Sequence, residues 1–424
     1  MRTGSTPLVT LLTYGTRGDV EPFVALAVRL RRAGARVRLV APETFRGLIG
    51  PYNLEFSGLP GDPQALARGM VDRAGSNVLR MVGVMARHIQ QIAVDAMHVI
   101  DEACQEADCI VHSFLMTASG HMAAVARGVP EVSAQLFPVF SPTGAFAGPT
   151  FPGLPLGPAY RRGTHRLNAM IYWQGSRLLY AWVRRQRRDL PALPAYPFSR
   201  RAPSPVPILY GFSSAVIPRP SDWGPGSLIT GYWFLGPPPG WTPPADVLRF
   251  LENGDPPVYV GFGSMIGRNW EALLRQTVAA LDEVGLRGLM ATGSPLAVGV
   301  DLPASILPIG DIPHTWLFPR VAAVVHHGGA GTTAAALRAG KPSLILPLTA
   351  DQSFWARRVQ CLGAGPPPLR RRKLQHDLST GLRLVRADRS MAQRAGQIGS
   401  EISREDGTGK AVEEILRLLG AGHI

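Results

Sequence analysis

Residues 322–346 read AAVVHHGGAGTTAAALRAGKPSLIL, and this segment indicates the fold class most clearly. The apolar run 322–325 has the length of a buried strand. A glycine-rich loop follows it and opens a helix predicted over 332–339, after which 344–346 is a second short strand. Strand, helix and strand at this spacing predict a parallel sheet covered by helices.

The loop between that strand and helix, HHGGAGTT, also suggests a function. Glycines let the backbone approach an anion closely, and a helix start offers unbonded N–H groups and a positive dipole end. A diphosphate fits such a place. The loop is not a P-loop, because Gly340-Lys341 is followed by Pro342 rather than by serine or threonine. The alternative interpretation is a tight turn with two buried histidines.

The N-terminus repeats the same pattern. Residues 8–14 form an apolar run of strand length, 15–18 a loop, and Pro22 suits the first turn of a helix. The residues 37–41 are the next predicted strand. This part of the chain therefore also predicts a parallel sheet.

A proline-rich segment at 216–244 reads as a linker between two domains. We therefore predict two domains, at 1–215 and at 245–424, with the last helix, 411–419, packing back on the first domain. The segment 138–163, crowded with proline, glycine and aromatic residues, predicts a long surface loop.

Composition limits the classes of partner. The chain has 424 residues and a formal net charge of +14, but the basic residues are scattered arginines, so nucleic-acid binding is not favoured. A basic face for anionic donors, or for acidic lipid headgroups at a membrane surface, fits better. The three cysteines lack metal-ligand spacing, and neither a signal peptide nor a membrane span is recognisable. We expect a soluble, cytoplasmic protein.

Four segments resemble the GT-B glycosyltransferases, in the branch of sterol glucosyltransferase-like and glycopeptide-antibiotic enzymes. They are 310–359, which resembles the donor-binding signature, 15–22 (GTRGDVEP), 211–233 and 258–264 (VYVGFGS). The resemblance covers most of the chain. It implies an α/β GT-B fold, in which two doubly wound Rossmann-like domains face each other across a cleft. The resemblance further implies that the N-terminal domain, 1–215, binds the acceptor and that the C-terminal domain, 245–424, binds the nucleotide sugar.

The resemblance also implies donor-binding roles for single residues. His326 matches a histidine that contacts the donor phosphates, and Ile312 lies where backbone groups meet the base. Asp351 and Gln352 match a pair that binds sugar hydroxyls, although they also suit a helix N-cap. The glycine loops near the diphosphate correspond to Gly263, Ser264, Gly329, Gly331 and Thr332. Ala334 stands where plant relatives carry a ribose-binding glutamate, which leaves uridine and thymidine donors open.

The acceptor side rests on fewer matches. Asp19 matches the catalytic base of the antibiotic enzymes, and a carboxylate there can take the proton of an acceptor hydroxyl. Its alternative role is an N-cap for a helix beginning near Pro22. His112 is a candidate helper at a neighbouring strand end. Further acceptor candidates, which core packing would also explain, are Met85, Phe137, Phe146, Phe151 and Trp173.

Together these features predict an inverting hexosyltransferase. We expect it to move a hexose, with glucose as first choice, from a UDP- or dTDP-sugar to a hydroxyl of a sterol or a polycyclic or macrocyclic natural product. No Asp-x-Asp occurs, so we expect neither a metal nor another cofactor. A nucleotide-sugar epimerase of related fold and a non-catalytic nucleotide-sugar binder are the alternatives.

Overall fold

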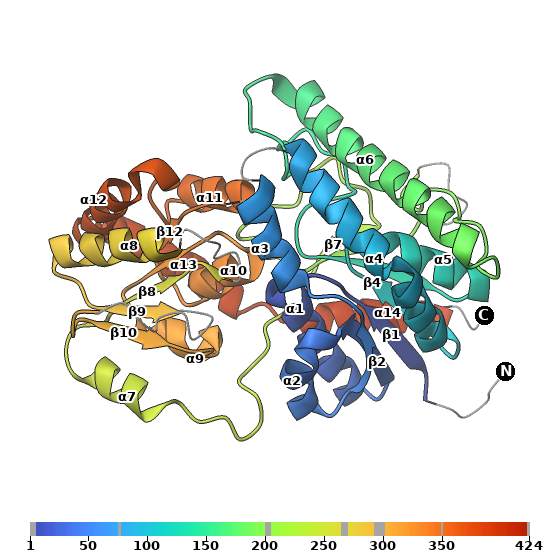
Figure 1. Ribbon diagram of the computed structural model, residues 1–424, viewed down its shortest axis with the longest axis horizontal. Coiled ribbons are helices and arrows are strands. Elements are labelled where there is room, and N and C mark those ends of the chain that lie inside the picture. The colour runs from blue at the N-terminus through green and yellow to red at the C-terminus, as the bar shows by residue number, and fades with distance from the viewer. Residues whose placement is uncertain are drawn as a thin grey trace. The chain divides into compact units, whose positions relative to one another are not determined.

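The computed structural model describes residues 6–74, 78–199, 205–263, 270–291, 302–348 and 351–421 (Figure 1). The chain divides into two compact units. The first contains Met1–Leu66, Val78–Leu235 and Asp406–Ile424, and the second contains Ala67–Asn77 and Gly236–Glu405. Residues 216–235, which we expected within a linker, therefore belong to the first unit and include one of its strands.

The first unit is built on a seven-stranded sheet of parallel neighbours in the order β3-β2-β1-β4-β5-β6-β7. The order reverses between β1 and β4, where Leu12 pairs with His112. Doubly wound sheets bind ligands beyond the carboxyl ends of their strands at such a switch point. The strands are β1 (Leu8–Leu12), β2 (Arg36–Pro42), β3 (Glu55–Leu59), β4 (Cys109–His112), β5 (Glu131–Gln135), β6 (Ile208–Tyr210) and β7 (Ser227–Ile229).

Helices cover both faces of this sheet. On one face, Val9 and Leu11 pack with α1 and with α14, whose Ile415 is fully buried. On the other face, Leu12 and Ile110 pack with α4 and α5. The helices are α1 (Arg17–Arg32), α2 (Arg46–Ile49), α3 (Pro63–Ala74, shared between the units), α4 (Val78–Cys104), α5 (Thr117–Arg127), α6 (Gly157–Gln186) and α14 (Gly407–Ala421), with 3-10 turns at Glu43–Phe45 and Gly50–Tyr52.

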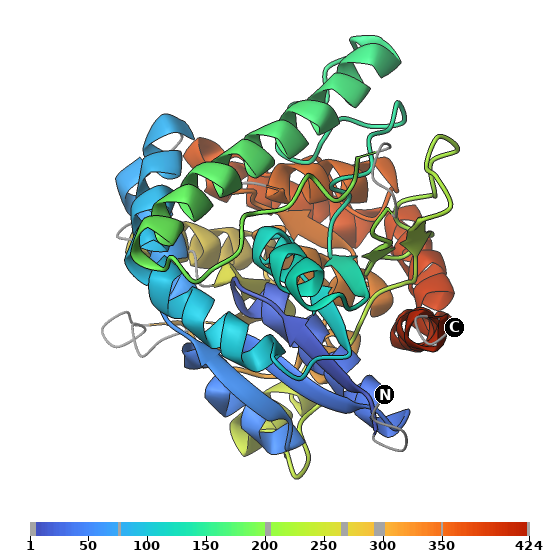
Figure 2. The same cartoon turned by 90° about the vertical axis from the view of Figure 1, so that its right-hand side faces the viewer.

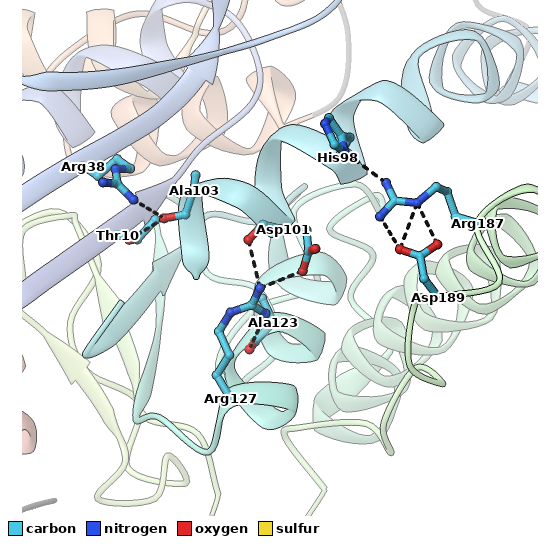
Figure 3. Close-up of polar contacts among 9 residues, drawn as sticks. All are labelled: Thr10, Arg38, His98, Asp101, Ala103, Ala123, Arg127, Arg187 and Asp189. Atoms are coloured by element: carbon cyan, nitrogen blue, oxygen red, sulfur yellow. Dashed lines mark hydrogen bonds and ion pairs between the residues drawn. The ribbon is translucent and has the colours of Figure 1, made fainter. Parts of the chain in front are cut away.

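The carboxyl end of α4 is fixed by a set of polar contacts (Figure 3). The carbonyl of Ala103 accepts hydrogen bonds from Thr10 on β1 and Arg38 on β2. Arg127 on α5 donates to both the carbonyl and the carboxylate of Asp101. These contacts satisfy helix-end carbonyls that would otherwise lack partners, so α4 is held against the sheet.

The segment expected as a surface loop at 138–163 differs from that expectation in two ways. Its last residues already belong to α6, and Val139, Phe140 and Ser141 are buried. The polar groups of Ser141 keep hydrogen-bond partners in this buried segment. The Tyr210 hydroxyl bonds to the Ser141 hydroxyl at 2.7 Å, and the Ser141 carbonyl accepts from Trp223 Nε1 at 3.1 Å. Buried polar groups that find such partners carry little penalty.

The second unit contains a five-stranded sheet of parallel neighbours in the order β10-β9-β8-β11-β12. Its strands are β8 (Val258–Gly261), β9 (Gly288–Ala291), β10 (Ile306–Ile309), β11 (Ala323–His326) and β12 (Ser343–Ile345). Its helices are α7 (Ala245–Glu252), α8 (Trp270–Val284), α9 (His314–Leu317), α10 (Ala330–Arg338), α11 (Gln352–Cys361), α12 (Leu374–Ala387) and α13 (Arg389–Ser403), with 3-10 turns at Phe318–Arg320 and Arg371–Lys373.

Two cores enclose this second sheet. Val258 and Val260 on β8 pack against α8 and α12, while Tyr259 and Leu289 face the cluster that contains Phe318 and Ala336. In the part of the chain that the structure describes, no helix is long and apolar enough to cross a bilayer.

Candidate functional site

The strongest candidate site in the second unit is the loop between β11 and α10. Gly328 has φ of +91°, and a Cβ there would lie 2.7 Å from Ile345 Cγ2 and 3.1 Å from the carbonyl oxygen of Gln352. Only glycine fits this position without strain. The chain can therefore turn sharply, with Gly329 as the N-cap of α10 and Gly331 and Thr332 in its first turn. Their N–H groups are those that helix geometry leaves unbonded.

His326, the last residue of β11, is fully buried. Its Nδ1 accepts a hydrogen bond from the Gly328 N–H at 3.1 Å. Burial of the ring is the main reason that the pKa of His326 lies well below its usual range, and the nearby His327 and His314 lower it further. The ring is therefore neutral. A neutral ring that accepts at Nδ1 carries its proton on Nε2. That Nε2 is buried and has no hydrogen-bond partner among the described residues.

His327 is a neighbour that our sequence prediction left out of the site. A Cβ on Gly263 would lie 2.8 Å from its Cε1, and a Cβ on Gly329 would lie 2.7 Å from its Nε2. These two glycines, which we predicted to approach the donor, thus make room for the His327 ring. Burial lowers the pKa of His327 to about 4, although a hydrogen bond with the Gly261 backbone acts in the opposite direction. The two adjacent histidines of the motif are the sequence feature from which a role for His327 could have been predicted.

The predicted sugar-binding pair lies at the start of α11. Asp351 is the N-cap residue, but its carboxylate makes no capping bond and instead accepts from Trp355 Nε1 at 2.9 Å. The side-chain carbonyl of the buried Gln352 accepts from the Leu348 N–H at 2.7 Å. Both side chains are therefore held in defined orientations.

For two further donor-binding candidates the structure gives no side-chain hydrogen bond. The side chain of Ile312 is buried in the core with Tyr259 and Phe318, so only its backbone could meet a ligand. Ser264 lies outside the residues that the structure describes.

In the first unit, Asp19 lies in the first turn of α1, directly beyond the carboxyl end of β1. The helix begins at Arg17, one turn earlier than the start near Pro22 that we predicted, and Thr16 is its N-cap. Asp19 Oδ2 accepts from the Thr16 N–H at 2.7 Å and from its hydroxyl at 3.0 Å. Asp19 is therefore at the N3 position of a capping box, the third residue of the helix, rather than the N-cap itself.

The surroundings of Asp19 also change its acidity. A Cβ on Gly15 would lie 2.3 Å from Asp19 Oδ2, so the loop before α1 closes tightly over the carboxylate. Burial raises the pKa of Asp19 above its ordinary value, although the two hydrogen bonds from Thr16 act in the opposite direction. A carboxylate with a raised pKa is a better proton acceptor than an ordinary one.

His112, predicted as a helper on the acceptor side, has a different neighbour. Its fully buried ring contacts Glu131 on β5 through Nε2 at 3.0 Å. The same carboxylate contacts His121 Nδ1 at 2.6 Å. Burial alone would raise the pKa of Glu131, but these two histidines lower it to about 2. The arrangement explains His112 as part of a buried polar cluster, and its observed partner is Glu131 rather than Asp19.

The acceptor candidates separate into two places. Phe137 contacts Phe114, and the buried Trp173 contacts Tyr196. Both belong to an aromatic cluster beyond the ends of β4 and β5, formed by Phe114, Phe137, Phe140, Tyr172, Trp173, Tyr196 and Phe198.

Two of the remaining acceptor candidates make other contacts, and the side chain of the third is not described. Phe146 lies against His165 on α6. The Phe151 N–H bonds to the Gly148 carbonyl in a turn. Met85 is on α4, and its side chain lies outside the described part of the structure.

Phe140 is the strained member of the aromatic cluster. It has φ of +67°, which is uncommon for a residue other than glycine, and it is buried. Its ring stacks on Phe198 with centroids 4.6 Å apart and also contacts Phe114 and Tyr172. Strain of this kind persists only where the surrounding packing holds it, and it often marks a functional site.

Comparison with known proteins agrees with this architecture. Residues 9–126 match the glycosyltransferase family 28 N-terminal domain, and residues 277–417 match the erythromycin biosynthesis protein CIII-like C-terminal domain. The glycotransferase of kitacinnamycin has the same fold, with a TM-score of 0.73 at 17% identity over 98% of this chain and all of that one. Two Rossmann-like units with these matches define the GT-B fold.

Relatives in sequence give the family. The chain is 35% identical to the O-mycaminosyltylonolide 6-deoxyallosyltransferase of Streptomyces fradiae, over 95% of each protein. It is 32% identical to a sterol 3-beta-glucosyltransferase of Cryptococcus neoformans, over 97% of this chain. The chain spans only about a quarter (27%) of the length of that fungal relative. The protein belongs to the GT-B glycosyltransferases, as residues 15–22 and 310–359 had indicated.

Proposed function

We propose that the protein transfers a hexosyl group from a nucleoside diphosphate sugar to a hydroxyl of an apolar acceptor, with inversion at the anomeric carbon. In this reaction the acceptor oxygen bonds to the anomeric carbon as the bond from that carbon to the diphosphate breaks. The acceptor proton passes to the Asp19 carboxylate, and the diphosphate leaves as an anion.

The observation that carries this proposal is the buried Nε2–H of His326, which has no hydrogen-bond partner among the described residues. It lies two residues before Gly328, whose sharp turn leads into α10. The first N–H groups of a helix have no partner within the helix. A phosphate oxygen would satisfy this donor with a charge-assisted hydrogen bond. The helix dipole would stabilise the charge that develops on the leaving diphosphate.

The acceptor class is inferred from the aromatic cluster and from the relatives. Aromatic rings beyond β4 and β5 suit a large apolar molecule. The relatives act, by name, on O-mycaminosyltylonolide and on a sterol, and they transfer, by name, a 6-deoxyallosyl and a glucosyl group. We propose a sterol or a macrocyclic or polycyclic natural product as acceptor, and glucose or a deoxyhexose as sugar.

The test uses UDP- and dTDP-hexoses, each with and without a panel of sterols and macrolactones. Released diphosphate and the gain in mass of the acceptor are measured together. We expect both to appear only when donor and acceptor are present. Interconversion of the donor sugar without any acceptor would instead identify an epimerase, and donor binding without any reaction would identify a non-catalytic binder.

We further propose that no metal is needed, because His326 and the start of α10 supply the stabilisation of the diphosphate. Among the described residues, no cluster of three or more His, Cys, Asp or Glu side chains could hold a metal ion. Turnover should therefore persist in excess chelator. Complete loss of turnover in chelator, with recovery on adding magnesium or manganese, would contradict this account.

A further inference from the structure

Helix α6 has an outer face whose apolar side chains are exposed in the part of the chain that the structure describes. The long helix runs along the outside of the first unit (Figures 1 and 2). Its buried side includes Trp173 and Tyr180. Its exposed side carries Leu167, Met170, Ile171 and Leu178, which are 39%, 54%, 58% and 75% exposed. At 3.6 residues per turn these four residues share one face, which we call the outer stripe.

This concentration is unusual within the protein. Nine large hydrophobic side chains are exposed in the described residues, and six of them lie within residues 154–178. Leu154 and Leu156, in the segment just before α6, add to the four of the outer stripe. Single exposed hydrophobic residues are ordinary, but a group of them indicates an interaction surface.

The charge beside the outer stripe has one sign. The α6 sequence contains six arginines and no aspartate or glutamate. Arg162 is paired with Asp222 on the first unit. Arg166, Arg177 and Arg185 make no ion pair with any described carboxylate, and on a helical wheel Arg166 and Arg177 flank the stripe while Arg185 continues it.

An anionic lipid bilayer fits this surface better than other partners. A helix that carries leucine and isoleucine between arginines lies in the headgroup region, with its apolar side chains at the acyl boundary. A symmetric dimer through α6 would bring the arginines of both copies together, at a cost in repulsion. We propose that the outer stripe and its flanking arginines dock the protein on a membrane surface that contains acidic phospholipid.

The docking can be tested by co-sedimentation with vesicles, which needs neither donor nor acceptor and is therefore independent of the proposed function. We expect the protein to sediment with vesicles of three parts phosphatidylcholine to one part phosphatidylglycerol, and to stay in solution with phosphatidylcholine alone. The double variant Arg166→Gln/Arg185→Gln should weaken partitioning roughly 25-fold, at about fivefold per arginine. Ile171→Gln/Leu178→Gln should weaken it at least about tenfold.

Matched controls change similar residues elsewhere. Leu384→Gln alters a leucine on α12 that is 45% exposed, and Arg371→Gln/Arg372→Gln removes two exposed arginines of the second unit. Both controls should sediment like the parent, and all variants should keep the parent melting temperature. The proposal fails if the parent does not bind the acidic vesicles, or if the controls weaken binding as much as the α6 variants. It also fails if Ile171→Gln/Leu178→Gln only converts a dimer in solution to a monomer.

Discussion

At the scale of single residues, Asp19 combines a structural and a proposed chemical role. Asp19→Asn keeps an oxygen that can accept from the Thr16 N–H, but it cannot take a proton. We predict that turnover falls by about 10²–10⁴-fold. The melting temperature should not fall, because the substitution removes a charge that burial disfavours. Steady-state rates and thermal melts on the same preparation measure both effects.

The companion variant and the pH profile separate the two roles of Asp19. Asp19→Ala also removes the capping contact and should cost roughly 1 kcal/mol of stability. In the parent protein, turnover should fall as the pH drops through the raised pKa of Asp19, because the base must be ionised. If Asp19→Asn kept nearly the turnover of the parent protein, the carboxylate would have a capping role only.

His326 carries the donor side of the proposal. We predict that His326→Ala weakens donor affinity and slows turnover, because the buried Nε2–H is lost. Since the ring is neutral in the folded protein, donor affinity should not depend on protonation of His326 at or above neutral pH. Isothermal titration with donor measures the change. His376→Ala on α12, a histidine remote from the β11–α10 loop in sequence, is the control. Unchanged donor affinity in His326→Ala would identify a purely structural histidine.

At the scale of elements, the turn from β11 into α10 depends on one glycine. Gly328→Ala would place a Cβ 2.7 Å from Ile345 Cγ2, at a φ of +91°. We predict a loss of about 1–3 kcal/mol of stability, together with weaker donor binding. Gly310→Ala, where a Cβ would meet nothing within 4 Å, should stay within about 0.5 kcal/mol of the parent. Equal effects of the two substitutions in urea unfolding would contradict this reading of the turn.

At the scale of the whole molecule, the last helix completes the core of the first unit although it follows the second unit in sequence. Ile415 on α14 is fully buried among residues that include Phe23 and Leu26 of α1. Ile415→Ala should cost about 2–5 kcal/mol. Leu384→Ala, at a site that is 45% exposed, should change stability by less than about 0.5 kcal/mol. A change below about 1 kcal/mol for Ile415→Ala in chemical denaturation would contradict this packing.

Features that depend on neighbouring residues could be predicted from the amino-acid sequence. The strand, loop and helix around residues 322–339 follow from short-range periodicity and from glycines that allow a sharp turn. The helix predicted over 332–339 is found as α10, Ala330–Arg338. The family was also recognisable, because the 310–359 motif is contiguous in the chain.

Tertiary structure alone decided the features that join distant residues. The segment around Ser141 is buried because Tyr210 and Trp223 bond to it from positions about seventy and eighty residues away. His112 meets Glu131, and the His327 ring occupies the space beside Gly263, only once parallel strands bring these positions together. Local patterns encode backbone conformation, whereas the partner of a buried polar group depends on packing between strands that are remote in sequence.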